Sequence, residues 1–348
     1  MTAPPKQSGS ARKQIGLALG DATGIGPEVT LKALATEAAA DDARYVLIGD
    51  TEQLHQLNQT LGLNLPLEKY SAGTSSRFSI CHPLAETLAK NLPAGSPEAA
   101  RAAVAWLEHG AKLCLRGELD ALVTAPVNKH AIVRAGIPFV GQTEFLSQQA
   151  GVNRTVMMLL GPDERGRWLR VALATVHIAL RDVPVKLTPE KILLAIARAA
   201  EACRDLGLTR ARVAVCGLNP HCGEGGEFGD EEPRLIEPAI AAARQKGFDV
   251  VGPVSGDTVF HQAIRGDFDA VVAMYHDQGL APLKLAAFDN GVNWTLGLPF
   301  IRTSPDHGTG YDIAGRGVAN PSSMVAAIRL AKQLVARASR PFDQKHGR

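Results

Sequence analysis

The sequence is poor in aromatic residues, in long apolar runs and in clustered charge, and each shortage excludes a class of protein. Of its 348 residues 5% are aromatic, which argues against a platform for stacking nucleic-acid bases. Lysine and arginine number 37 against 35 aspartate and glutamate, so the formal charge is +2, and no basic run of five or more occurs. This balance gives no electrostatic footprint for nucleic acid. No stretch of 18 uncharged apolar residues occurs, so we expect no transmembrane helix.

Cysteine is scarce too, and its spacing shows no pairing pattern. The chain has five cysteines, at Cys81, Cys114, Cys203, Cys216 and Cys222, and no CxxC motif. An odd number without paired spacing predicts no disulfide framework, so we expect a reducing compartment, the cytoplasm. Residues 1–13 are polar and contain no apolar core of a signal peptide, so we expect a flexible tail there.

Apolar strand-like runs alternate with helix-like segments along the rest of the chain. The strand-like runs are residues 15–19, 45–48, 121–124, 169–176, 213–216, 250–251 and 270–274. The helix-like segments are residues 27–36, 97–116, 189–206, 233–246 and 324–338. Such alternation is typical of an α/β protein with mostly parallel strands, and the length is that of about two domains.

Three histidines each follow a strand-like run, at His177, His221 and His276. Carboxyl ends of parallel strands lie side by side, so the three imidazoles could converge on one divalent cation with an open position. A single histidine at a strand end is more often a structural hydrogen-bonding group, so the spacing leaves both interpretations open. Asp277 is either a partner that orients His276 or a solvated turn residue.

Three loops carry further polar residues. The glycine-rich segment 20–28 lacks both the GxGxxG spacing of a Rossmann nucleotide loop and the Lys-Ser/Thr pair of a phosphate loop, so we interpret it as a tight turn. Gln142 and Thr143 open a predicted helix, where they bind an anion or Thr143 caps the helix. Segment 302–321 has four glycines, two prolines and many hydrogen-bonding side chains, which suits a nucleotide-binding loop at the rim of a scaffold.

Together these motifs resemble the 4-hydroxythreonine-4-phosphate dehydrogenase family of vitamin B6 (pyridoxine and pyridoxal phosphate) synthesis. The residues that carry the resemblance span nearly the whole chain: 20–28, 124–129, 141–145, 177, 219–226, 275–284 and 302–315. Segment 307–321 is also similar to the adenosine-binding loop of isocitrate and isopropylmalate dehydrogenases, which share that fold. The resemblance implies a two-domain α/β/α sandwich of this fold, without a Rossmann motif.

The resemblance also implies how the chain is divided and what it binds. We expect residues 14–130 together with 300–348 to form a first α/β domain that carries the dinucleotide loop. Residues 131–299 would form a second α/β domain with the metal ligands and the dimer interface. The implied partners are a second copy of the chain, in a homodimer with its active site at the interface, and a small phosphorylated substrate, with no nucleic acid and no membrane.

The resemblance assigns site residues position by position. One divalent cation per subunit, zinc, magnesium or cobalt, would be held by His177, His221 and His276, drawn from both subunits. The substrate would be bound by Gln142, Thr143, Lys284, Asn293 and Arg302. NAD or NADP would be bound by His307, Gly308, Asp312, Ile313, Ala314 and Asn320. Proton transfer would fall to Lys129 or to Asp257, which matches a family position near the substrate.

The reaction implied is the oxidation and decarboxylation of 4-phosphohydroxy-L-threonine to 3-amino-2-oxopropyl phosphate. Gln142 departs from the histidine usual in the family, and segment 312–320 is closer to a divergent branch. That branch is similar to dehydrogenases of four-carbon sugar-acid phosphates (threonate or erythronate type) or of aromatic cis-dihydrodiol carboxylates. Lys284, Asn293 and Arg302 favour a phosphorylated substrate. A metal-dependent hydrolase or lyase without a redox step is the rival from another class.

Overall fold

The computed structural model describes residues 13–40, 42–71 and 75–338. The expected tail, apart from Lys13, lies outside these residues. The first part of the chain forms β1 (Gln14–Ala18), α1 (Gly26–Glu37), β2 (Arg44–Ile48), α2 (Thr51–Thr60), β3 (Leu67–Lys69), β4 (Phe78–Cys81), α3 (Pro97–Leu115) and β5 (Ala121–Thr124). The middle part forms α4 (Lys129–Arg134), α5 (Gln142–Gln149), β6 (Val156–Pro162), β7 (Trp168–Leu173), α6 (Val183–Lys186), α7 (Pro189–Asp205) and β8 (Val213–Cys216). The last part forms α8 (Glu237–Gln245), β9 (Val250–Val254), α9 (Val259–Ile264), β10 (Ala270–Ala273), α10 (His276–Ala287), β11 (Val292–Leu296), β12 (Ile301–Pro305) and α11 (Ser322–Ala338).

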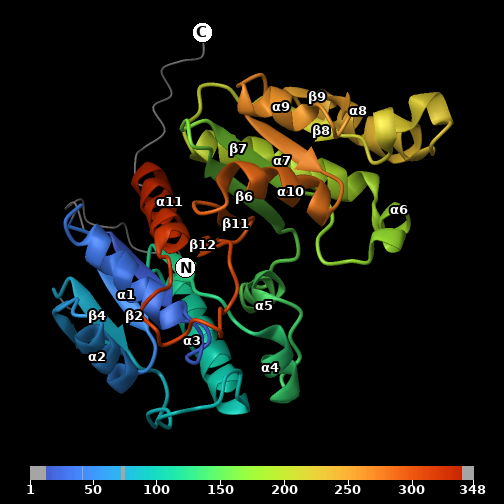
Figure 1. Ribbon diagram of the computed structural model, residues 1–348. Coiled ribbons are helices and arrows are strands. Elements are labelled where there is room, and N and C mark those ends of the chain that lie inside the picture. The colour runs from blue at the N-terminus through green and yellow to red at the C-terminus, as the bar shows by residue number, and fades with distance from the viewer. Residues whose placement is uncertain (1–12, 41, 72–74, 339–348) are drawn as a thin grey trace, which may run out of the picture.

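The described residues place twelve strands in one continuous sheet, in the order β3-β4-β2-β1-β5-β12-β11-β6-β7-β10-β8-β9. Most neighbours run parallel, as the alternation of elements predicts. The pairings β12–β11, β11–β6 and β6–β7 at the centre are antiparallel. The two lobes of the molecule, with α1 to α3 in one and α7 to α10 in the other, therefore share a single sheet (Figure 1).

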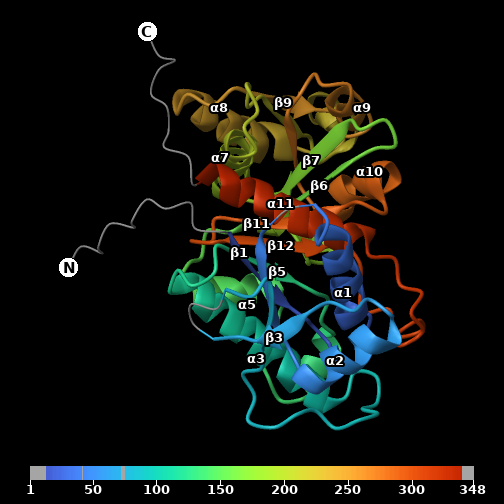
Figure 2. The same ribbon diagram turned by 90° about the vertical axis from the view of Figure 1, so that its left-hand side faces the viewer.

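Helices cover both faces of this sheet (Figure 2). In the second lobe, Val171 and Val271 pack in one cluster with residues of α9 and α10. Ala172 and Val272, their immediate neighbours, pack in the other cluster with residues of α7. Alternate residues of a strand point to opposite faces, so these fully buried strands need apolar side chains at every position.

Local signals account for where the long helices begin. Ser96 accepts a hydrogen bond from the Ala99 amide at the start of α3, and Thr188 accepts one from the Lys191 amide at the start of α7. A proline follows each cap at the first helical position, where its missing N–H has no cost. Both starting points agree with the sequence prediction.

Several predicted boundaries differ from the observed ones, by one to four residues. Strand β7 ends at Leu173 rather than at residue 176, so His177 lies in a loop. Helix α8 begins at Glu237 rather than at residue 233, because a π-helical turn at Glu232–Ile236 precedes it. Across the described ranges, no helix is both long enough and apolar enough to span a membrane.

Candidate active site

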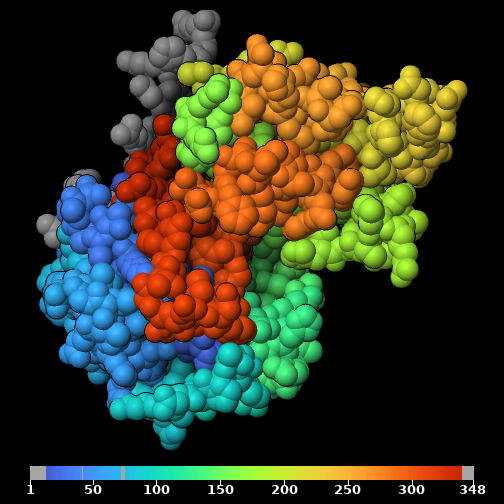
Figure 3. Space-filling model, in the orientation of Figure 1, coloured from blue at the N-terminus to red at the C-terminus, as the bar shows by residue number. Residues whose placement is uncertain are grey.

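A cavity of about 600 Å³ opens at the centre of the sheet. Figure 3 shows the surface hollowed between α10 and the segment of α4 and α5. The cavity brings together nine of the residues assigned from the sequence: Lys129, Gln142, Thr143, His177, Lys284, Asn293, Arg302, His307 and Gly308. These residues come from seven separate stretches of the chain, so only the fold assembles them.

Side chains on one face of the central strands form the floor of this cavity. Arg302 lies beside Leu122 in the parallel pair β12–β5, so its side chain shares a face with that of Thr124. Asn293 lies opposite Ser304 in the antiparallel pair β11–β12. Asn293 and Arg302 therefore project from the same face of neighbouring central strands.

Arg302 is the most deeply buried charged group of the cavity, with 2% of its surface exposed. Its guanidinium donates hydrogen bonds to the Thr124 hydroxyl at 3.1 and 2.7 Å and to the Thr295 hydroxyl at 2.9 Å. A further bond, of 3.1 Å, goes to Oε1 of Gln142. All these acceptors are neutral.

A buried cation without a contacting carboxylate is costly unless something supplies negative charge. Burial lowers the pKa of Arg302 to about 10, and the nearby charge of Glu144 acts in the opposite direction. The guanidinium thus stays charged at neutral pH. The arrangement suits an anionic ligand, since charge-assisted bonds to arginine are strong and directional.

Gln142 and Thr143 lie in the first turn of α5, beside Arg302. Gly141 occupies the N-cap position and no side chain caps the helix, so the capping interpretation of Thr143 is wrong. Nε2 of Gln142 donates to the Ala125 carbonyl at 3.1 Å. The Gln142 amide is therefore held at both ends, between Arg302 and the end of β5.

Two cavity atoms are buried and have no hydrogen-bond partner in the described part of the chain: Oδ1 of Asn293 and Nε2 of His307. Lys284, by contrast, lies 3.1 Å from the carboxylate of Asp306. Burial raises the pKa of Asp306, and Lys284 opposes that shift. Buried polar atoms without partners are rare in proteins, which is consistent with a ligand that supplies partners at this site.

The structure places two of the three assigned histidines together. The rings of His177 and His276 lie 5.5 Å apart between centroids. A hydrogen bond of 2.7 Å joins Nδ1 of His276 to Asp277, so Asp277 is the partner that orients this ring. Burial and the charge of His276 lower the pKa of His177. Among residues whose placement is described, no three acidic, histidine or cysteine side chains of this one chain form a metal-binding group.

His221 lies apart, on an exposed turn with unusual backbone geometry. Five successive residues, His221 to Gly225, have positive φ between 44° and 82°. Glu232 stabilises the turn: its buried carboxylate accepts bonds from the Leu218 and Asn219 amides, both at 2.8 Å. Residues outside glycine adopt this conformation only when their surroundings enforce it, and such strain is typical of functional sites.

The other assigned residues lie outside the cavity. Asp257 is exposed in the loop after β9, near Cys222. Asp312, Ile313, Ala314 and Asn320 lie in the loop between β12 and α11. Asn320 also has a local role, because its Oδ1 accepts bonds from the Ser322 amide and hydroxyl at the start of α11.

Comparison with known proteins shows what the chain is similar to. The family model described as "Pyridoxal phosphate biosynthetic protein PdxA" matches residues 41–331. The chain belongs to the PdxA family. The resemblance drawn from its motifs is thereby confirmed.

Relatives in the PdxA family carry two different names. The chain is 44% identical to the 4-hydroxythreonine-4-phosphate dehydrogenase of Geobacter metallireducens, over 93% of this chain and 96% of the relative. It is 42% identical to the D-threonate 4-phosphate dehydrogenase of Cupriavidus necator, over 93% and 97%.

Solved structures confirm the expected fold. The 4-hydroxythreonine-4-phosphate dehydrogenase of Klebsiella pneumoniae matches with a TM-score of 0.78 and 41% identity, over 93% of this chain and 99% of that one. The isocitrate dehydrogenase of Methylococcus capsulatus matches with a TM-score of 0.52 and 15% identity, over 93% and 86%, which shows a shared fold alone.

Four residues of this PdxA-family site were not assigned from the sequence: Thr124, Thr295, Asp306 and Glu232. Thr124 lies in the motif 124–129 that carries the resemblance, but nothing local shows that its hydroxyl meets Arg302. The contacts of Thr124 and Thr295 with Arg302 depend on strand register, which the sequence does not specify here.

Proposed function

We propose that this PdxA-family chain is a metal-assisted, NAD(P)-dependent dehydrogenase that oxidises and decarboxylates a phosphorylated four-carbon hydroxy acid. The first candidate substrate is 4-phosphohydroxy-L-threonine, with 3-amino-2-oxopropyl phosphate, CO₂ and NAD(P)H as products. The observation that carries the proposal is the buried guanidinium of Arg302 at the cavity floor, bonded only to neutral groups.

The residues of the cavity divide the binding of such a substrate between them. Arg302 offers a fixed guanidinium to phosphate or carboxylate, and Lys284 adds a second positive charge. Thr143 adds a hydroxyl. The unpartnered Oδ1 of Asn293 accepts a hydrogen bond from a substrate hydroxyl or amino group. These contacts fix the orientation of a small, highly charged molecule.

The histidines fit a divalent cation. His177 and His276 lie close enough to share one ion, and the bond from His276 Nδ1 to Asp277 leaves Nε2 as a ligand. The third imidazole, His221, would come from a second copy of the chain. Imidazole ligands suit zinc and cobalt better than magnesium.

Each bound group supplies its own chemistry: the cation supplies Lewis acidity toward the substrate hydroxyl, and the nicotinamide accepts hydride. The chain supplies the group that transfers the proton. Lys129, at the start of α4, lines the same cavity as His177. Lys129 in its neutral form is therefore the first candidate, whereas Asp257 would need to reach the site from a second copy.

The loop after β12 is the proposed dinucleotide site. His307 and Gly308 line the cavity, and Asp312, Ile313, Ala314 and Asn320 continue the loop away from it. The buried Nε2 of His307 has no hydrogen-bond partner among the described residues, so a bound dinucleotide could supply one. A dinucleotide along the loop would place its nicotinamide end at the cavity.

The proposal includes a homodimer. Large apolar side chains are exposed on α10, where Leu285 is 90% exposed, at the C-cap of α10, where Phe288 is 75% exposed, and on α6, where Val185 is 84% exposed. Exposed apolar patches of this kind mark protein interfaces. The five cysteines are all free thiols, which is compatible with a reducing cytoplasm.

D-threonate 4-phosphate is the second candidate substrate, because a 42% identical relative is named a D-threonate 4-phosphate dehydrogenase and Gln142 departs from the usual histidine. The Gln142 amide, held by Arg302 and Ala125, replaces the usual histidine and cannot carry positive charge. The two candidates differ in the group on the carbon beside the carboxylate, an amine or a hydroxyl.

The test is NAD(P)H formation at 340 nm with a divalent cation and either dinucleotide. The substrates compared are 4-phosphohydroxy-L-threonine, D-threonate 4-phosphate, D-erythronate 4-phosphate and an unphosphorylated cis-dihydrodiol carboxylate. Turnover of the first supports the main proposal, and turnover of a sugar-acid phosphate alone supports the second. Reaction only with the unphosphorylated diol would contradict the role given to Arg302 and Lys284.

A further inference from the structure

The loop between β12 and α11 is seated on the first turn and helix of the chain. The Ile25 amide donates to the Thr309 carbonyl at 2.8 Å. The Tyr311 hydroxyl donates to the buried carboxylate of Asp21 at 2.6 Å. The glycine-rich segment 20–28 thus supports this loop. The sequence of the segment alone does not predict this contact.

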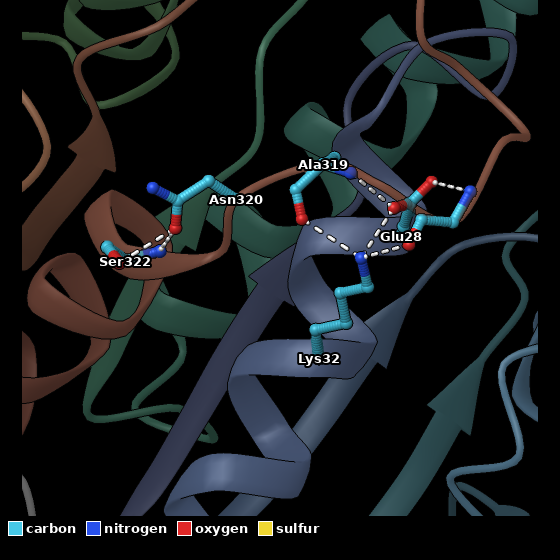
Figure 4. Close-up of polar contacts among 6 residues, drawn as sticks. Glu28, Lys32, Ala319, Asn320 and Ser322 are labelled. Atoms are coloured by element: carbon cyan, nitrogen blue, oxygen red, sulfur yellow. Dashed lines mark hydrogen bonds and ion pairs between the residues drawn. The ribbon is translucent and has the colours of Figure 1, made fainter.

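Two charged side chains of helix α1, Glu28 and Lys32, form hydrogen bonds with the backbone of the same loop at Gly317 and Ala319 (Figure 4). Glu28, 2% exposed, accepts hydrogen bonds from the amides of Gly317 at 3.2 Å and Ala319 at 2.8 Å. Lys32 donates to the carbonyls of the same two residues, at 2.8 and 3.0 Å. Glu28 and Lys32 also bond each other at 2.8 Å.

We propose that Glu28 and Lys32 are positioning residues that hold the loop in the shape that receives the dinucleotide. The inference rests on the proposed function, because that function makes the loop a dinucleotide site. In this loop, Glu28 and Lys32 form hydrogen bonds only with backbone atoms of Gly317 and Ala319. They therefore fix the path of the loop backbone and leave the loop side chains available to a ligand.

The chemistry of Lys32 separates this role from direct phosphate binding. An ammonium group has three N–H donors, and here they meet Glu28, the Gly317 carbonyl and the Ala319 carbonyl. No donor is left for a phosphate. The charges of Glu28 and Lys32 also neutralise each other, so the pair gives little electrostatic attraction for a dinucleotide.

The loop itself explains why such a pair is useful. Gly315 and Gly317 both have positive φ, of 75° and 69°, and glycine gains the most freedom when a chain is released. A loop with this composition would sample many shapes without external contacts. Holding it in one shape before binding reduces the entropy lost when the ligand arrives, which raises affinity.

The experiment compares Glu28→Gln and Lys32→Met with the wild-type protein in the presence of its divalent cation. Binding of NAD and NADP is measured by calorimetry, together with kcat, both KM values and the melting temperature. We expect the Kd and KM of the dinucleotide to rise about tenfold in each variant. We expect kcat and the KM of the phosphorylated substrate to stay within about twofold, a split that loss of structure alone does not produce.

Glu37→Gln is the matched control. Glu37 lies at the other end of α1, is fully buried and forms ion pairs with Arg329 and Lys332 of α11. Its loss should lower the melting temperature and leave the dinucleotide Kd unchanged. Variants of Glu28 and Lys32 that lose stability but bind the dinucleotide like the wild type would overturn this inference alone. A wild-type protein that binds neither NAD nor NADP would overturn the proposed function as well.

Discussion

At the scale of single residues, the site depends on a charge kept in place by neutral groups. Arg302 is buried in the sheet, and two threonine hydroxyls and one amide orient it. A carboxylate partner would offset part of this charge, as Asp306 does for Lys284. Neutral acceptors fix the geometry and keep the positive charge available, which is how a binding site differs from a structural ion pair.

Arg302→Lys tests this interpretation, because it keeps the charge and removes the planar set of donors. A lysine ammonium cannot bond Thr124, Thr295 and a substrate anion in the same geometry. We expect kcat/KM for the phosphorylated substrate to fall on the order of 100-fold, mainly through KM, with the dinucleotide Kd unchanged.

Arg167→Lys is the control for that measurement. Arg167 forms an ion pair with Asp163 at the surface, so the same exchange there should leave the kinetics as they are. Equal kinetics for Arg302→Lys and the wild type would show that the arginine only supports the sheet.

At the scale of elements, the left-handed turn at residues 221–225 is the most constrained piece of backbone. Its conformation depends on Glu232, whose carboxylate accepts hydrogen bonds from the Leu218 and Asn219 amides, just before the turn. A Cβ at Gly223 would lie 2.9 Å from Oε2 of Glu232, whereas one at Gly225 would meet nothing within 4 Å. Both glycines have positive φ, so a side chain at either position causes similar backbone strain. The two positions differ in the room available for a Cβ atom.

Gly223→Ala and Gly225→Ala therefore form a matched pair. Each should lose about 1–2 kcal/mol of unfolding free energy, because L-residues disfavour the left-handed region. Gly223→Ala should lose at least about 1 kcal/mol more, through its contact with Glu232, and should also retain less metal. Urea unfolding and elemental analysis measure both quantities. Equal losses in the two variants would mean that Glu232 does not shape the turn.

At the scale of the whole molecule, the arrangement of the histidines predicts an active site shared between two chains. His177 and His276 lie together, and His221 lies apart from them. Alanine at any of the three should abolish turnover and leave a folded protein, because each imidazole is a proposed ligand of the cation. Purified variants would be tested singly and after mixing under conditions that exchange subunits.

Mixing gives the decisive comparison. His177→Ala with His221→Ala should recover about a quarter of wild-type activity, since a mixed dimer has one intact site. His177→Ala with His276→Ala should recover none, since both residues belong to the same half of each site. No recovery in the first mixture, with mixed dimers verified by mass spectrometry, would place all three ligands in one chain.

Much of this molecule was predictable from its sequence, whereas strands β3, β4, β6, β11 and β12 were missed. Strands β1, β2, β5, β7, β8, β9 and β10 were found because they are mostly apolar, and helices α3 and α7 because Ser96 and Thr188 cap them. The central strands β11 and β12 were missed because residues such as Asn293 and Arg302 face the cavity and break the apolar run. The residues proposed to bind the substrate thus interrupt the apolar pattern of the strands that carry them.

The supporting residues were not predictable for a different reason. Glu28 and Glu232 act on backbone atoms far along the chain, such as Ala319, or across a turn, such as Leu218. In the sequence, Glu28 looks like an ordinary acidic residue in the first turn of a helix. The domain division expected from the family stays a prediction, because the twelve-stranded sheet runs through both lobes.

The place of β12 in that sheet has a consequence for biosynthesis. Strand β12 lies between β5 and β11, and α11 packs over it, with Thr303 bonded to the Ala327 carbonyl. Strand β12 follows β1 to β11 in the chain, so during synthesis β5 keeps an open edge until residues 301–305 have emerged from the ribosome. Open edges pair with other chains, and large proteins rely on chaperones at this stage. The sheet becomes continuous across the two lobes only when β12 inserts between β5 and β11, so we expect this insertion to be the step that commits the polypeptide to its native form.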